Sequence, residues 1–192
     1  MDPSEIEFLA ENEMMTIIPN FNYGKIFLVS GEIGPFRAGM PLKVPLWLAV
    51  NLKSRQKCRL VAPDWLDVEK LQELKEAEVQ NPLFCKMPSE YYIIEAQMLL
   101  NVADGDIPRS DALRTVIKDL WDKRLAKFRT SIDRFIKEGG MHAKVDNLTT
   151  MEINSVRPIL PHALDLLNRL RGVQIGGSSQ QITQLGSSSL NV

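Results

Sequence analysis

Side chains that could hold a metal or drive catalysis are sparse in this sequence. The candidate zinc ligands are Cys58, Cys85, His142 and His162, which stand singly along the chain. A structural zinc site needs four ligands directed at one point, and a hydrolytic site needs a nucleophile beside an oriented base. We therefore expect two small apolar cysteines in a reducing compartment and two surface histidines, with no metal site.

Glycines between residues 31 and 39 come nearest to a nucleotide-binding loop. Gly31, Gly34 and Gly39 have the wrong spacing for GxGxxG, and no GK[ST] sequence occurs. Their spacing predicts a tight loop. The many Asp and Glu residues lie where solvated helix faces are expected, which explains them without paired-carboxylate chemistry. We therefore expect no enzyme activity, no cofactor and no small-molecule substrate.

Charged side chains are unevenly distributed, although the formal net charge is −1. Residues 2–13 contain acids and no base. The bases of a possible contact patch, with no acid among them, are Lys53, Arg55, Lys57 and Arg59. Patches of this kind are typical of solvated faces and protein contacts, and less often of nucleic-acid contacts. Direct nucleic-acid binding therefore stays open as an alternative function.

The element around which the chain is organised is a helix predicted over residues 110–138. Apolar residues recur there at spacings of three and four, Ser110 or Asp111 can cap its start, and Gly139-Gly140 can end it. A helix of this length spans roughly 40 Å, more than the width of a small domain. Part of its apolar stripe therefore needs a partner. The expected interface residues are Trp121, Leu125, Phe128, Ile132 and Phe135.

The first part of the chain reads as a small strand-rich module. Asp2 to Glu5 predicts a capped helix start, and the predicted strands are residues 14–19, 25–30 and 42–47. Pro45 favours an edge position for the last of these strands. Residues 31–39 are predicted as a loop and residues 48–59 as a short helix.

The second part of the chain is predicted to be helical. Helices are expected over residues 64–78, from Pro88-Ser89, over 110–138, from the capping box at Thr149–Glu152, and after Pro161. From Gly172 the sequence is rich in Gly and Ser and predicts a flexible tail. The fold class is thus α+β and mainly α. The expected divisions are a small strand-rich module at 1–62, a helical domain at 63–171 and the tail at 172–192.

Composition places limits on the class of protein. The chain has 192 residues with 44% hydrophobic content, enough for a real core. Its acidic N-terminus lacks the apolar region of a signal peptide, and its apolar runs are too short to span a membrane. The three tryptophans lie among apolar residues, which favours packing over base stacking.

Ordered sequence motifs resemble one known family. The motifs are EIEFLAENE at 5–13, TIIPNF at 16–21, GPF at 34–36, VPLWLAVNLKSRQKCRL at 44–60, DWLDVEKL at 64–71, MPSEYY at 87–92, DIPRSD at 106–111 and AKVDNLTTMEIN at 143–154. Together they resemble the subunits of the GINS complex, and among these the second of the Psf group. The resemblance covers nearly all of residues 1–171, and the tail shows no match.

The resemblance implies a function that the residues alone do not give. GINS is a heterotetramer of four related subunits, each with a helical A domain and a small strand-rich B domain. It is a non-catalytic part of the nuclear replicative helicase, bridging the MCM motor ring and its Cdc-type companion protein. The expected partners are therefore three sibling subunits, the MCM ring and the companion protein, with DNA touched only indirectly or weakly. No membrane partner is expected.

Overall fold

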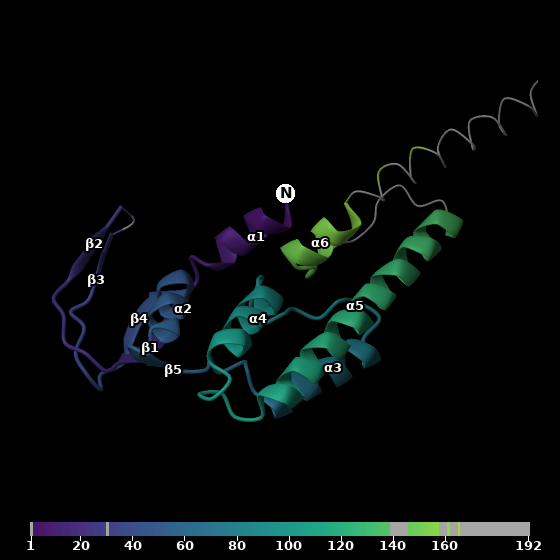
Figure 1. Cartoon of the computed structure of the whole chain (residues 1–192). Coiled ribbons are helices and arrows are strands. Elements are labelled where there is room, and N and C mark those ends of the chain that lie inside the picture. Colours follow the sequence, from purple (N-terminus) through teal and green to yellow (C-terminus); the bar gives the residue numbers. More distant parts are fainter. Residues whose placement is uncertain (1, 30, 139–145, 158–160, 162–164, 166–192) are drawn as a thin grey trace, which may run out of the picture.

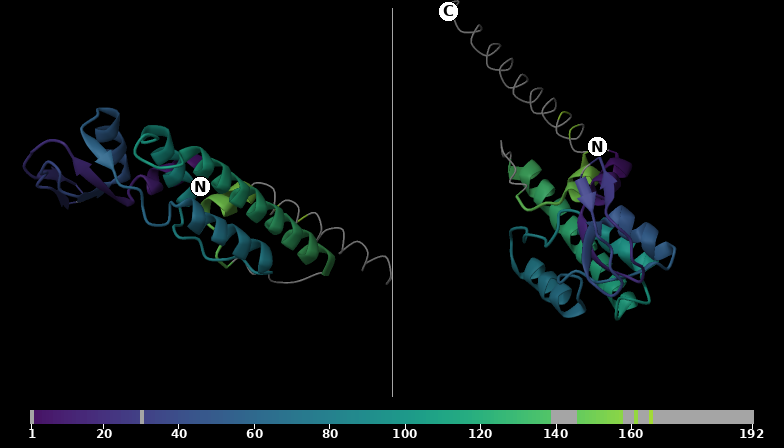
Figure 2. Two further views of the ribbon diagram at one scale, coloured as in Figure 1. Left: turned by 90° about the horizontal axis from the view of Figure 1, so that it is seen from below. Right: turned by 90° about the vertical axis from the view of Figure 1, so that its left-hand side faces the viewer.

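The computed structural model describes residues 2–29, 31–138, 146–157, 161 and 165, with no description of the side chains of 135–138. The molecule is elongated, with a sheet module at one end and helices along the rest (Figures 1 and 2). The fold is therefore the expected α+β arrangement, with helices predominating. Some predicted features lie outside the described residues: most of the 139–147 loop, the helix after Pro161, both histidines and the tail from Gly172.

A three-stranded antiparallel sheet forms the centre of the N-terminal module. Its order is β4-β1-β5, with β1 at Met14–Pro19, β4 at Leu42–Pro45 and β5 at Cys58–Leu60. Alternate side chains of β1 are buried, as expected for a sheet with one covered face. Strand β4 is an edge strand, which is the position that Pro45 favoured.

Two boundaries after the sheet differ from prediction. The chain enters helix α2 at Leu46–Ser54, so Trp47 belongs to a helix and not to the preceding strand. Residues 58 and 59, expected to end that helix, instead belong to strand β5 at Cys58–Leu60, which pairs with β1. The largely apolar run of 42–50 shows no period that would separate a strand from a helix. Strand β5 has only three residues, which are too few to show the alternation typical of a strand.

A second, two-stranded sheet projects from the module as a β-arm (Figure 1). Strand β2 at Ile26–Leu28 pairs with β3 at Gly31–Ile33, and Tyr23 bridges Phe36 below them. The prediction of a loop over 31–39 was therefore wrong for residues 31–33, which form strand β3. Gly34 has a φ of +116°, and an added Cβ would lie 3.0 Å from the Gly24 carbonyl oxygen, so this position requires glycine.

The helical half contains α3 at Val68–Gln80, α4 at Tyr92–Val102, α5 at Ser110–Glu138 and α6 at Thr150–Val156. The long helix begins and ends where the sequence predicted. Helix α1 at Pro3–Ala10 begins with the expected Asp2–Glu5 pairing, in which the backbone N–H of Asp2 donates to Glu5. It packs against α4 and α6 through Ile6 and Ala10.

One hydrophobic core runs from the sheet into the helices. It includes Ile17 and Leu60 of the sheet and Leu99 and Leu120 of the bundle, all at most 3% exposed. The sequence did not indicate where the N-terminal module docks. In the structure the module packs on the chain's own helices, with α2 against α4.

A polar contact joins the two halves beside this core. Asp106, in the α4–α5 loop, accepts a hydrogen bond from the Leu60 backbone N–H at 2.8 Å and pairs with Lys53 at 2.7 Å. Burial opposes ionisation of this carboxyl, but the Lys53 and Leu60 hydrogen bonds outweigh burial and lower the pKa of Asp106. The contact therefore fixes the angle between sheet and bundle with a charged pair.

Candidate protein-protein interface

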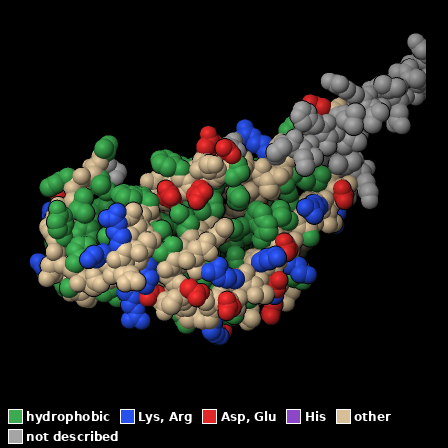
Figure 3. Space-filling view, viewed as in Figure 1, with side chains coloured by type: hydrophobic (Ala, Val, Ile, Leu, Met, Phe, Trp, Pro, Cys, Tyr) green, Lys and Arg blue, Asp and Glu red, His purple; other side chains and the backbone are tan. Residues whose placement is uncertain are grey.

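An apolar groove of about 440 Å³ lies between α4 and α5, with α6 at one side. In Figure 3 hydrophobic side chains gather between these helices. The lining residues are Ile93, Ala96, Gln97 and Leu100 of α4, Arg114, Ile117, Lys118 and Trp121 of α5, and Met151 of α6. A concave apolar surface of this size is typical of sites that receive a ligand or a partner side chain.

Helical spacing explains how the groove is built. The lining residues of α4 stand at positions i, i+3, i+4 and i+7, and those of α5 repeat the same spacing. Such residues share one face of a helix. Ala96 is small, which leaves the floor open, while Trp121 and Ile93 remain half-buried along the walls. The groove therefore has the geometry of a helix-in-groove binding surface.

Two bases lie on the α5 side of the groove. Arg114 donates to the backbone oxygen of Leu100 and to Asn101 Oδ1 at 3.1 Å, so its guanidinium is held against α4. Lys118 is exposed and has no hydrogen-bond or ion-pair partner among the described residues. The rim thus offers a free positive charge beside an apolar floor.

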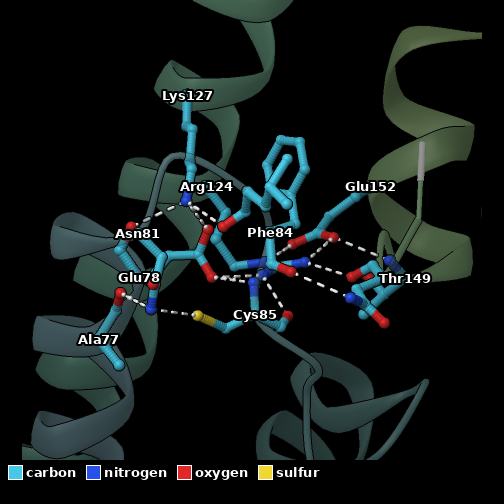
Figure 4. A network of polar contacts seen from close by, with 11 residues as sticks. Ala77, Glu78, Asn81, Phe84, Cys85, Arg124, Lys127, Thr149 and Glu152 are labelled. Carbon is cyan, nitrogen blue, oxygen red and sulfur yellow. Dashed lines mark hydrogen bonds and ion pairs between the residues drawn. The ribbon is translucent and has the colours of Figure 1, made fainter. Parts of the chain in front are cut away.

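A buried cluster centred on Arg124 holds the far side of the bundle together (Figure 4). Arg124 Nε donates to Glu152 at 2.6 Å, and its terminal nitrogens donate to Glu152 at 2.9 Å and Glu78 at 2.8 Å. Its other N–H groups donate to the backbone oxygens of Cys85 at 3.0 Å and Asn147 at 2.7 Å. All five donors of the guanidinium are therefore used.

The ionisation of Arg124 is secured by these partners. The side chain is 0% exposed, and burial alone would lower its pKa. The hydrogen bonds and charge of Glu152, with the charge of Glu78, reverse this effect and raise the pKa of Arg124. Arg124 is thus the charged centre of a buried hydrogen-bond network.

Lys127 extends the cluster by one helical turn. Its Nζ donates to Glu78 Oε1 at 2.7 Å and to the backbone oxygens of Glu78 and Leu83. The Phe84 ring lies against both cations, 5.3 Å from Arg124 and 5.2 Å from Lys127. These contacts fix the loop after α3 on the surface of α5.

The cluster also positions one wall of the groove. Glu152, besides its bonds to Arg124, accepts a hydrogen bond from the Thr149 backbone N–H at 2.8 Å, which caps α6. Helix α6 is short, so its place on the bundle depends on this anchor. Met151, the residue before Glu152, then reaches the groove.

The structure divides the stripe predicted as an interface. Trp121 lines the groove, and Leu125 and Ile132 are half-buried. Phe128 is only 6% exposed and packs edge-on against Phe84 with ring centroids 6.2 Å apart. The side chain of Phe135 lies outside the described part. Phe128 therefore contributes to the chain's own core.

The predicted basic patch is divided as well. Lys53 is paired with Asp106, whereas Arg55, Lys57 and Arg59 are exposed and have no side-chain ion pair among the described residues. The patch thus presents three free bases around the α2–β5 turn.

Other expectations concern metals, cysteines and membranes. Cys58 and Cys85 are free thiols. Within the described ranges no group of three His, Cys, Asp or Glu side chains is arranged to hold a metal. Those ranges also contain no helix with the length and apolar character needed to cross a membrane.

Sequence reasoning missed the groove and the Arg124 cluster. The sequence predicts a solvated helix face for the acidic residues of α3. Glu78 is nevertheless 1% exposed. One signal was present: the Thr149–Glu152 capping box predicted the start of α6. Nothing local in the sequence indicates that Glu78, Arg124 and Glu152, far apart along the chain, meet.

Comparison with known proteins gives the family. The sequence profile described as PSF2 N-terminal domain matches residues 2–61, and that of the GINS complex protein helical bundle domain matches residues 65–171. A human relative named DNA replication complex GINS protein PSF2 is 52% identical over 171 residues, covering 89% of this chain and 92% of the relative.

More distant animals and fungi have similar proteins. A Drosophila melanogaster relative, named probable DNA replication complex GINS protein PSF2, is 50% identical over 99% of this chain and 93% of its own length. A Schizosaccharomyces pombe relative named GINS protein psf2 is 34% identical over 88% of the chain and 90% of its own length. Two profiles in series and relatives matched over almost their full length leave one assignment: the chain belongs to the PSF2 family of DNA replication complex GINS proteins.

Proposed function

We propose that this chain is a non-catalytic scaffold subunit of a heterotetrameric GINS complex. The observation that carries the proposal is the α4–α5 groove, whose apolar floor and half-buried Trp121 remain uncovered in the single chain. Its relatives are named as GINS complex proteins. The occupant we propose is an amphipathic helix of a sibling subunit, with an acidic side chain near Lys118.

The interface extends along α5 beyond the groove. Leu125 and Ile132 are half-buried and continue from Trp121 toward the end of the helix. We include Phe135 on the basis of its spacing. Phe128 supports this surface from within, so Phe128→Asp would disturb the chain's own packing, whereas Ile132→Asp is a sharper test of assembly.

The wider role follows from family membership. In this proposal the complex joins the MCM ring and its Cdc-type companion in the nucleus, where it serves initiation of replication and fork progression. In this proposal residues 1–62 form the B domain and residues 63–171 the A domain, while the tail expected at 172–192 lies outside the described residues. The chain needs no cofactor and touches DNA indirectly.

Substitution of Trp121 tests the proposed groove. Trp121→Ala removes an aromatic anchor from a docking surface, and loss of such an anchor costs about 2 kcal/mol or more in binding. We expect the variant to lose most co-purification with the other GINS subunits when they are expressed together. Size-exclusion chromatography with subunit quantification measures this loss.

The matched control is Trp65→Ala, another half-buried tryptophan that packs on the core but does not line the groove. Circular dichroism of each purified chain separates assembly from folding. Equal recovery of the complex with Trp121→Ala and with the unaltered chain would remove the groove from the proposal.

A further inference from the structure

The β2–β3 arm has one face packed on the module and one facing solvent. Ile26, Leu28 and Ile33 belong to the packed face, since they join the core or pack against it. Alternate residues of the first strand point the other way. Tyr23 is 61% exposed and Phe27 78% exposed. In Figure 3 green side chains and several blue ones mark this end of the molecule.

A shallow hollow of about 690 Å³ lies at the base of the arm. Its walls include Tyr23, Phe36, Arg37 and Met40. Phe36 is 1% exposed and stacks on Phe21, whereas Met40 is 53% exposed. Arg37 is exposed, and its guanidinium has no hydrogen-bond or ion-pair partner in the described part of the chain. The hollow therefore joins apolar walls to one free cation.

Backbone hydrogen bonds hold the hollow in place. Tyr23 and Phe36 exchange two of them at 2.9 Å, and the Gly39 N–H donates to the Pro19 carbonyl at 2.9 Å. Asn22 Oδ1 accepts from the Ala38 N–H at 2.8 Å. The site is thus preformed, which lowers the entropy cost of binding.

Basic residues predominate in the part of the chain that carries the hollow. Between Met14 and Ala62 the only acid is Glu32, which pairs with Lys25 at 2.8 Å. The bases of this region are Lys25, Arg37, Lys43, Lys53, Arg55, Lys57 and Arg59. The turn that carries Lys57 lies beside the arm, because the Asn20 N–H donates to the Lys57 carbonyl at 2.9 Å. This charge favours an acidic partner.

We propose that the hollow at the base of the β2–β3 arm docks an extended acidic segment of another protein. A carboxylate of the segment pairs with Arg37, and an apolar side chain packs between Tyr23 and Met40. The two-stranded arm has no further strand beside it among the described residues, so an extended backbone can pair along it. Tyr23 is the one exposed aromatic ring among these walls, because Phe36 is buried, and a single ring offers no track for successive bases. This favours a protein over a nucleic acid.

The test uses a fluorescein-labelled peptide of alternating glutamate and leucine and the full chain, alone or with its GINS siblings. Fluorescence anisotropy measures binding. We expect Arg37→Glu to weaken binding by at least about tenfold, because it places like charges together, and Met40→Ser to weaken it as well. Arg37→Lys keeps the charge but loses the bidentate geometry, so its effect is smaller.

The control for charge is Arg129→Glu, on an exposed position of α5 far from the arm. The control for recognition is the same peptide with glutamine in place of glutamate, which should bind weakly. No binding of the acidic peptide, or equal binding to wild type and Arg37→Glu, overturns the proposal. Binding of a single-stranded oligonucleotide that depends on Arg37, without peptide binding, overturns it in favour of nucleic acid.

Discussion

At the residue scale, the feature that most distinguishes this chain is the buried Arg124. Its guanidinium pairs with Glu78 of α3 and with Glu152 of α6. A second cation, Lys127, forms the third ion pair of the cluster, with Glu78. Burying charges is costly unless each is paired and hydrogen-bonded. Here every donor of both cations has an acceptor, so the network can specify one arrangement of three helices.

Replacing Arg124 should be strongly destabilising. Arg124→Met leaves Glu152 buried without its cation and leaves Glu78 with Lys127 alone, which costs about 3–5 kcal/mol of the free energy of unfolding. Arg129→Met makes the same chemical change at an exposed position of α5 and should be nearly neutral. Urea denaturation followed by circular dichroism measures both. A loss below about 1 kcal/mol for Arg124→Met would show that the carboxylates relax without it.

The sequence could not give this network. Trp121 and Leu125 follow from helical periodicity, which is local, whereas the meeting of Glu78 with Arg124 depends on how two helices pack. A charged residue in an amphipathic pattern is normally solvated. Arg124 departs from this rule: it stands four residues after Leu120 and four before Phe128, on the apolar face of α5. Periodicity is therefore compatible with its burial but does not indicate which acids it meets.

At the element scale, elements with local sequence signals were predictable, whereas strands that exist through pairing were not. Helix α5 has many turns of consistent periodicity and clear signals at both ends. Strand β5 has three residues and exists because it pairs with β1, a contact that no local preference encodes. The same reason explains β3, which Gly31 and Gly34 made look like a loop.

The α4–α5 loop and the sheet are joined by Asp106, and acid should break this joint. Because its folded pKa is lowered, its stabilising effect is present above the ordinary value of 3.8 and is lost as the pH falls through the lowered pKa. Asp106→Asn should therefore cost about 1–3 kcal/mol at neutral pH and little in strong acid. Urea titrations at several pH values measure the difference.

The control is Asp122→Asn, since Asp122 is exposed on α5 and makes no side-chain contact among the described residues. Its free energy of unfolding should follow the wild-type pH dependence. A cost of Asp106→Asn that stays constant with pH would mean that the charge of Asp106 is not what stabilises the joint.

At the scale of the whole molecule, the chain is elongated and carries one proposed contact surface in each half. The sheet module is basic and carries the arm, while the bundle carries the apolar groove (Figure 3). The family models cover both halves in series. Resemblance of short motifs identified this family, whereas the surfaces depend on packing and had to be found in the structure.

The central claim is that the α4–α5 groove receives a sibling GINS subunit. Gln97 is exposed and lines this groove, so Gln97→Trp fills it without removing a core contact. Gln72→Trp makes the same change on an exposed position of α3 that does not line it. The most direct measurement is the affinity of each purified chain for the other GINS subunits, by isothermal titration calorimetry. The account predicts that Gln97→Trp binds at least about tenfold more weakly than wild type, or about 1.4 kcal/mol, and that Gln72→Trp binds unchanged. Equal affinity of all three chains would contradict it.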